Sequence, residues 1–158
     1  QRQMCIRDST GSVYNYDRTD MIYLLLGLFA VILILVGGMQ WESAAARRIA
    51  PLAGEALKRG ILVGAICNAV SFMAANGLLN GVRHTGNTVE MLKQWGGANY
   101  TGEALYEERQ AVRDGNVVTA NGTGYLEFTR ECLLALKADT PDRIEASYKF
   151  NKYGFCRQ

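Results

Sequence analysis

The sequence predicts an α/β protein built on a doubly wound, mostly parallel sheet with helices on both faces. Short apolar runs rich in β-branched residues alternate along the chain with stretches of helical spacing, which is the pattern of such sheets. The runs end at small or polar residues, and ligands bind outside the carboxyl ends of strands in this fold class. With 158 residues, 49% of them hydrophobic, the chain is long enough for one domain with a sizeable core.

The first half of the chain is predicted to hold two buried strands and the helices that follow them. The helical stretch contains Pro51, which cannot donate a hydrogen bond inside a helix, so we expect two pieces or a kink. The helix after the second strand stops before Gly77, a residue suited to the C′ position. In chain order the predicted elements are a strand over 30–36, the turn Gly37-Gly38, a helical stretch over 43–59, a strand over 61–66 and a helix over 68–76.

The second half is predicted to hold a helix, a hairpin and two further helices. Thr88 suits the N-cap of the first helix, and Asp114-Gly115-Asn116 is typical of a tight hairpin turn. The predicted elements are a helix over 88–94, a loop over 95–100, a hairpin over 111–119 whose second strand runs over 116–120, and helices over 125–136 and 141–150.

One apolar segment, residues 21–41, has two interpretations. It contains 21 residues without a charge, which is long enough to cross a bilayer as a helix. Alternatively it breaks at Gly27, and residues 30–36 form a buried strand. The β-branched residues in 30–36 favour the strand, and the α/β pattern downstream requires it. We therefore do not expect this segment to span a membrane.

The remaining N-terminal residues are not predicted to belong to the fold. Residues 1–20 show no periodicity and resemble translated linker sequence, so they are treated as a separate, artefactual segment. The rest of the chain, residues 21–158, is predicted to form a single α/β domain.

Composition excludes several classes of protein. A net charge of +2 without a basic stripe argues against a nucleic-acid partner. The 4 cysteines form no CxxC pair, and the chain contains a single histidine, so we expect no metal site. We also expect no cofactor, because no motif indicates one. Unpaired thiols are typical of a reducing compartment, so we expect a cytoplasmic protein.

Cys67 is the principal candidate for chemistry. It lies between the predicted strand over 61–66 and the helix over 68–76, where a sharp turn would expose its side chain. Such an elbow requires small residues two positions before and after the nucleophile, and Ala65 and Ala69 satisfy this. The helix N-terminus behind the sulfur favours the thiolate. A buried cysteine acting as a small hydrophobic residue is the alternative, which we expect for Cys132.

Several predicted turns converge with this cysteine. Gly37-Gly38, Cys67 and Asn121-Gly122 all fall at carboxyl ends of predicted strands, so they are expected to line one crevice. Asn121 and Gly122 are candidates for substrate binding, although capping of the helix over 125–136 is the alternative role of this turn. Glu42 is either a substitute acid reaching the crevice or a first-turn helix residue favoured by the dipole.

The order of these segments resembles the PfpI-type family of the class I glutamine amidotransferase-like superfamily, which includes the parkinsonism-associated deglycase. The similarity covers roughly residues 29–150 and implies a flavodoxin-like fold, a reactive elbow cysteine and a homodimer. The stretches that carry it are Ile32-Leu33-Ile34-Leu35-Val36-Gly37-Gly38, Gly64-Ala65-Ile66-Cys67, Gly77-Leu78-Leu79-Asn80-Gly81, Val118-Thr119-Ala120-Asn121-Gly122-Thr123 and Glu127-Phe128.

The resemblance assigns roles to individual residues. Cys67 corresponds to the nucleophile, backbone N–H groups at Gly37, Gly38 and Asn68 to the oxyanion-binding turns, and His84 to a histidine near the thiol in some members. The alternative for His84 is local hydrogen bonding within its own turn.

The chain also departs from the family pattern. The acid that hydrogen-bonds the cysteine has no counterpart, protease-like members carry histidine where Asn68 stands, and a late His-x-Glu pair is absent. The chain thus resembles a member without its first β-α-β unit, which would expose a sheet edge and favour aggregation or a partner.

Two functions follow as expectations. The first is a cysteine-dependent hydrolase or a glyoxalase/deglycase-like enzyme acting through Cys67 on a small carbonyl or amide substrate. The second is a non-catalytic redox sensor or stress-response binding protein, in which Cys67 is oxidised to a sulfenic or sulfinic acid held by the same amides.

Overall fold

The computed structural model describes residues 4–7, 13–16 and 31–155, and the chain divides into two compact units, Gln1–Ala30 and Val31–Gln158. In the first unit, β1 (Met4–Arg7) pairs antiparallel with β2 (Val13–Tyr16). No strand was predicted in residues 1–20, and their assignment to a separate segment stays a prediction. Cys156 and residues 21–30 of the apolar segment lie outside the described residues.

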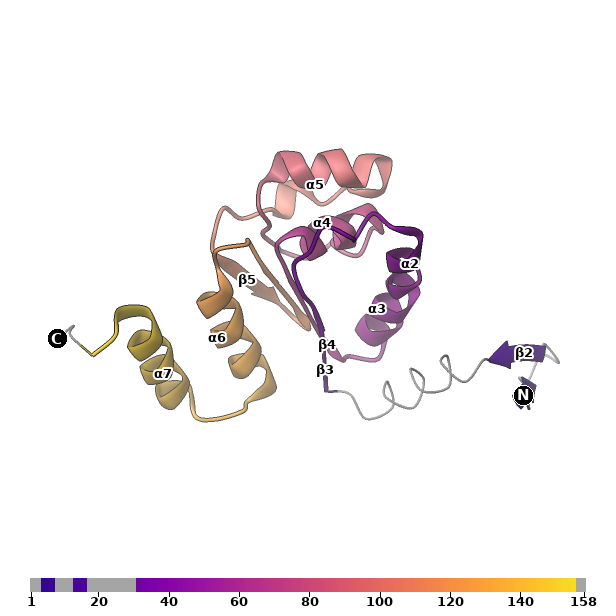
Figure 1. Ribbon diagram of the computed structural model, residues 1–158. Coiled ribbons are helices and arrows are strands. Elements are labelled where there is room, and N and C mark those ends of the chain that lie inside the picture. The colour runs from indigo at the N-terminus through magenta and orange to yellow at the C-terminus, as the bar shows by residue number, and fades with distance from the viewer. Residues whose placement is uncertain (1–3, 8–12, 17–30, 156–158) are drawn as a thin grey trace. The chain divides into compact units, whose positions relative to one another are not determined.

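The second unit is built on a four-stranded sheet in the order β3-β4-β6-β5 (Figure 1). The strands β3, β4 and β6 run parallel, and β5 is antiparallel to β6. The sheet confirms the predicted mostly parallel arrangement. The strands are β3 (Ile32–Leu35), β4 (Leu62–Ile66), β5 (Ala111–Asp114) and β6 (Val117–Ala120).

Helices cover both faces of this sheet, as expected for a doubly wound fold (Figure 1). On one side lie α2 to α5, and on the other lies α6, against which α7 packs. The helices are α2 (Ala44–Arg47), α3 (Ile49–Lys58), α4 (Asn68–Ala75), α5 (Val89–Gly96), α6 (Tyr125–Leu136) and α7 (Pro141–Tyr153), with short 3₁₀ helices η1 (Gly97–Asn99) and η2 (Glu103–Leu105).

The alternation of side chains along β4 explains the two layers. Val63 belongs to the core cluster with α3 and α4, whereas Leu62 belongs to the cluster with α6. Gly64 faces α6, where a Cβ atom would lie 2.7 Å from Cζ of Phe128. Glycine at this position therefore allows α6 to approach the sheet closely. Cys132 of α6 is 5% exposed and burial raises the pKa of its thiol to about 11, which agrees with the predicted core role.

Local signals located several boundaries correctly. Thr88 Oγ1 accepts a hydrogen bond from Met91 N at 3.1 Å, so it caps α5 as predicted. The hairpin of β5 and β6 turns at Gly115, whose φ of +55° suits a residue without Cβ.

Other boundaries differ from the prediction. The helical stretch over 43–59 divides at Arg48, and Pro51 lies in the first turn of α3, where no intrahelical N–H bond is lost. The predicted loop over 95–100 is instead the end of α5 followed by η1, and the last helix continues to Tyr153.

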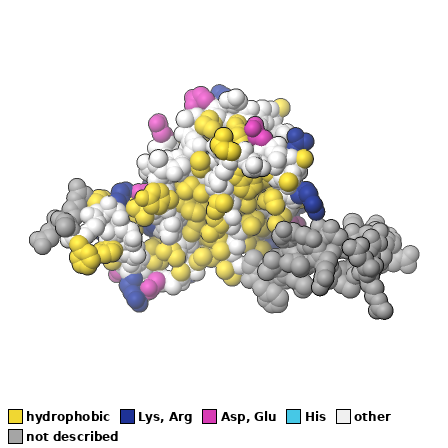
Figure 2. All heavy atoms as spheres, viewed as in Figure 1, with side chains coloured by type: hydrophobic (Ala, Val, Ile, Leu, Met, Phe, Trp, Pro, Cys, Tyr) yellow, Lys and Arg dark blue, Asp and Glu magenta, His cyan; other side chains and the backbone are white. Residues whose placement is uncertain are grey.

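The surface near β3 is apolar. Figure 2 shows hydrophobic side chains gathered across the middle of the face in view. Exposed hydrophobic residues in and beside β3 are Val31, Ile34, Val36 and Met39. Within the described part of the chain, no helix has both the length and the hydropathy needed to cross a membrane.

Candidate active site

Cys67 lies on a strained turn between β4 and α4. Its φ of 62° and ψ of −132° place it in a region that side-chain-bearing residues rarely adopt. The Cys67 N–H group donates to the Ala120 carbonyl at 3.0 Å, which ties the turn to the end of β6. Ala65 and Ala69, the small residues on either side, are fully buried. The structure thus has the predicted elbow geometry, and strain of this kind is characteristic of functional positions.

Two glycine turns approach the half-buried sulfur. A Cβ atom on Gly122 would lie 3.2 Å from Sγ of Cys67, and one on Gly37 would lie 3.6 Å from the same atom. The ends of β3, β4 and β6 therefore meet at one point, as expected for the carboxyl edge of a parallel sheet. The absence of side chains at both glycines leaves space beside the thiol.

Asn87 completes the surroundings of the sulfur, although it was not among the predicted site residues. Its Oδ1 atom accepts a hydrogen bond from Gly122 N at 2.9 Å, which fixes the orientation of the amide. The Nδ2 group consequently faces Sγ of Cys67 at 3.6 Å and Oδ1 of Asn68 at 3.3 Å. Asn68 in turn donates from Nδ2 to the Gly38 carbonyl at 3.2 Å. Two asparagine side chains therefore tie the three turns together.

The contacts of the thiol are with amides. Among the described residues, its side-chain hydrogen-bonding partners are Asn87 Nδ2 and, at 3.9 Å, Asn68 Oδ1. Neither group can accept a proton at neutral pH, so neither is a general base. Within the same residues, no three His, Cys, Asp or Glu side chains are grouped as metal ligands.

His84 does not provide the basic partner that the resemblance implied, and this expectation is corrected. The side chain is fully buried, with Nδ1 2.8 Å from the Val82 carbonyl and Nε2 2.8 Å from the Tyr100 hydroxyl. Because a carbonyl only accepts, Nδ1 carries the proton and Nε2 accepts from Tyr100. Both ring nitrogens are therefore used to hold the turn, which is the local alternative considered above.

This burial predicts a loss of stability in weak acid. Desolvation lowers the pKa of His84, outweighing the opposing bond to Val82. In the unfolded chain the imidazole takes up a proton near pH 6.5, whereas in the folded chain it does so only at a lower pH. The free energy of unfolding therefore decreases as the pH falls from above 6.5 toward the pKa of the folded state. We expect the free energy of unfolding in urea to decrease from pH 7 to pH 5.5. The chain has a single histidine, so in a His84→Asn variant the free energy of unfolding should depend less on pH over this range. An equal dependence on pH in the two proteins would contradict this account.

Glu42 is not brought to the thiol. It is exposed and lines a separate cavity of about 260 Å³ together with Trp41, Phe72 and Trp95. Cys67 is not part of that lining. The interpretation of Glu42 as a substitute acid is therefore not supported by its position.

Asn121 organises its own turn. Its Oδ1 atom accepts from Thr123 N at 3.0 Å, while its Nδ2 group donates to the Arg109 carbonyl at 3.4 Å. The N-cap of α6 is Gly124, without a side-chain cap bond, so the capping alternative for Asn121 is wrong. The candidate role in substrate binding remains a prediction.

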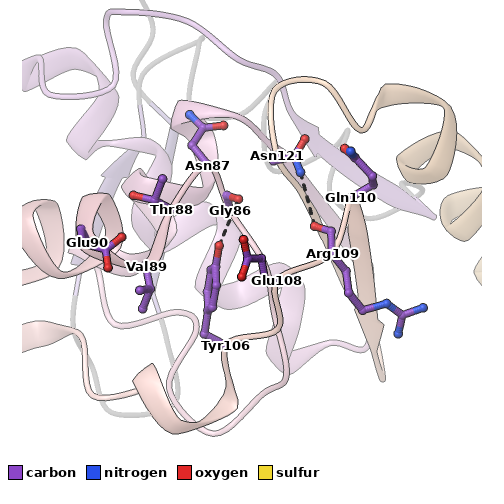
Figure 3. Close-up of a pocket in the computed structure, with 10 residues that line it drawn as sticks. All are labelled: Gly86, Asn87, Thr88, Val89, Glu90, Tyr106, Glu108, Arg109, Gln110 and Asn121. Atoms are coloured by element: carbon purple, nitrogen blue, oxygen red, sulfur yellow. Dashed lines mark hydrogen bonds between the residues drawn. The ribbon is translucent and has the colours of Figure 1, made fainter.

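A pocket of about 540 Å³ opens beside the turn that carries Asn87 (Figure 3). Asn87 and Asn121 belong to its wall, together with Tyr106 and Glu108. Asn87 Nδ2 also lies 3.6 Å from Sγ of Cys67, so this side chain borders both the thiol and the pocket. The volume suits a small-molecule ligand.

The molecule is therefore an α/β protein with an elbow cysteine at the carboxyl edge of a parallel sheet. The profile of the DJ-1/PfpI family matches residues 29–135. The chain belongs to the DJ-1/PfpI family, as the resemblance indicated.

Relatives and solved structures agree with this assignment. The Bacillus subtilis protein named "Uncharacterized protease YdeA" is 42% identical over 124 residues, which are 78% of this chain and 61% of that protein. "Uncharacterized protease YoaZ" from the same species is 40% identical over 121 residues, covering 77% and 57% of the two chains. The chain thus spans about three fifths of the length of these relatives.

Two solved structures share the fold. A thiJ/pfpI family protein from Bacillus anthracis superposes with a TM-score of 0.79 at 34% identity, covering 97% of this chain and 71% of that one. The DJ-1 superfamily protein Atu0886 from Agrobacterium tumefaciens gives a TM-score of 0.72 at 32% identity, with 94% and 77% covered. These likenesses confirm the flavodoxin-like α/β fold.

Proposed function

We propose that this protein is a cysteine-dependent hydrolase or a glyoxalase/deglycase-like enzyme that acts on a small carbonyl or amide substrate through Cys67. The observation that carries the proposal is the strained elbow, which holds a half-buried sulfur between two glycine turns. Such strain is retained where it positions a reacting atom. The names of the two Bacillus subtilis relatives add support for hydrolysis of an amide.

The first chemical step follows from this arrangement. The Cys67 thiol loses its proton to water, and the thiolate forms a C–S bond to the substrate carbonyl carbon. The π electrons of the carbonyl pass to its oxygen, and backbone N–H groups of the Gly38 and Asn68 turns are the proposed donors to that oxyanion. With an amide, collapse breaks the C–N bond, the amine leaves with a proton from water, and a second water hydrolyses the thioester.

Matched serine variants test this proposal. We expect turnover of methylglyoxal or a fluorogenic peptide amide to be lost in Cys67→Ser and retained in Cys132→Ser, because the second thiol is buried in the α6 cluster. Peptide mapping of the trapped acyl-enzyme should place the acyl group on Cys67. Full turnover by Cys67→Ser would contradict the proposal.

A redox role is the second candidate, and the amide surroundings of the sulfur favour it. Since the side-chain partners of Sγ among the described residues are neutral amides, repeated acid–base catalysis lacks an evident protein group. Peroxide would oxidise the thiolate to a sulfenate and be reduced to water, and Asn87 Nδ2 could donate to the sulfenate oxygen. Uptake of one oxygen atom at Cys67 without turnover would support this candidate over the enzyme. The homodimer and the cytoplasmic location stay predictions.

A further inference from the structure

We infer that the pocket beside Cys67 selects substrates that carry a cationic group close to the reacting carbonyl. This inference rests on the proposed function, because it assigns a substrate class to the same nucleophile. Its structural basis is the placement and charge of the side chains that line the pocket of Figure 3.

The pocket is close enough to the thiol to receive part of its substrate. Asn87 lines the pocket and also lies with Nδ2 3.6 Å from Sγ of Cys67. Asn121 lines it as well, and the next residue along the chain, Gly122, borders the sulfur. A molecule whose carbonyl meets Cys67 would therefore extend past Asn87 into this space.

Two lining carboxylates lack a compensating cation. Among the described residues, the side chains of Glu90 and Glu108 form no ion pair or hydrogen bond, and both are exposed. Neighbouring carboxylates differ, because Glu103 binds Lys93 at 2.7 Å and Glu107 binds Arg83 at 3.3 Å. Lys93 also lies in the field of Glu90, but its ammonium group is hydrogen-bonded to Glu103.

The cation in the pocket lining does not neutralise these charges. Arg109 binds Glu107 at 3.4 Å, and Figure 3 shows its guanidinium group directed away from the other labelled side chains. The charge that faces the pocket is consequently negative, which attracts a cationic ligand and repels an anionic one.

Tyr106 shows that both carboxylates act on the same space. Burial is the largest cause that raises the pKa of its hydroxyl, an interaction with the Thr85 side chain lowers it, and the negative charges of Glu108 and Glu90 raise it. The two carboxylates come from different segments, the first turn of α5 and the chain after Tyr106. Glu90, Glu108 and the half-buried Tyr106 therefore line the same pocket, and their oxygen atoms can accept hydrogen bonds from a cationic group.

Charge-matched thiol reagents test this inference without requiring turnover. Methanethiosulfonates with a two-carbon arm ending in trimethylammonium, methyl or sulfonate are used at low ionic strength, and modification of Cys67 is followed by peptide mapping. In each case the thiolate forms a disulfide with the reagent and methanesulfinate leaves. For each thiol we compare the rate constant of the cationic reagent with that of the anionic reagent, and 2-mercaptoethanol serves as the reference thiol. We expect this ratio to be about tenfold higher at Cys67 than for 2-mercaptoethanol, because two nearby negative charges act with little screening at low ionic strength.

The double variant Glu90→Gln/Glu108→Gln should bring this ratio close to that of 2-mercaptoethanol and leave the rate with the methyl reagent within about twofold. The control Glu55→Gln/Asp142→Asn removes the same charge from α3 and α7, whose residues do not line the pocket, and should keep most of the preference. A ratio equal to that of 2-mercaptoethanol in the parent, or unchanged in the pocket variant, overturns the inference alone. Failure of all three reagents to modify Cys67 overturns the proposed function and the inference with it.

Discussion

The Phe72→Ala variant is expected to unfold with a free energy about 4 kcal/mol lower than that of the parent chain. Phe72 is 2% exposed in the middle of α4, and its ring lies 4.7 Å from that of Trp41, measured between centroids. Truncation would remove buried apolar surface and leave a cavity in the cluster between α4 and the sheet. Since whole domains are stable by only about 5–15 kcal/mol, this loss is large. Urea unfolding followed by far-UV circular dichroism measures it.

Phe150→Ala is the matched control for this variant. The same atoms are removed from a side chain that is 51% exposed in α7, where alanine is also a good helix former. We expect a change within about 1 kcal/mol for this control. Similar losses in the two variants would contradict the placement of Phe72 in the core.

Gly122→Ala is expected to slow the alkylation of Cys67 by iodoacetamide about tenfold, equivalent to about 1.4 kcal/mol of activation free energy. The added Cβ would lie 3.2 Å from Sγ and 3.4 Å from Oδ1 of Asn87, so it would occupy the space beside the sulfur and press on its amide partner. Peptide mapping resolves Cys67 from the other cysteines. The thermal midpoint should change little, because the affected atoms lie at the surface turn.

Gly38→Ala provides the comparison. It adds the same methyl group to the neighbouring turn, where the new Cβ atom would lie 3.9 Å from Trp41 Nε1. Alkylation should then remain within about twofold of the parent rate. Equal slowing by both substitutions, or no slowing by Gly122→Ala, would show that these turns do not enclose the sulfur in the way described.

Much of the fold was predictable because its signals are local. The β-branched runs, the hairpin turn at Gly115 and the N-cap at Thr88 act over a few residues, and each lies where the sequence indicated. Boundaries that depend on packing were less predictable. The division of the helical stretch at Arg48, for example, precedes Pro51, the residue expected to cause it.

Among the residues of the site, the position of Cys67 could be predicted from the sequence, whereas its polar neighbours could not. Cys67 was identified because its elbow carries a signature in adjacent residues, with Ala65 and Ala69 at the required spacing. Asn87 is 20 residues away along the chain, and no pattern in the neighbouring residues predicted its contact with the sulfur. The single histidine attracted attention by residue type, yet burial directs both its nitrogens elsewhere.

Within residues 31–155, the order of the strands and helices, the elbow at Cys67 and the family could be read from the amino-acid sequence. These features arise from side-chain period, backbone preference and contiguous motifs, which are properties of neighbouring residues. The polar groups that face the sulfur, and the pocket carboxylates that have no cationic partner among the described residues, became evident only in the folded chain. The physical reason is that hydrogen bonds and ion pairs depend on atoms meeting within a few ångströms, and distant segments are brought to that separation only by the packing of the whole sheet.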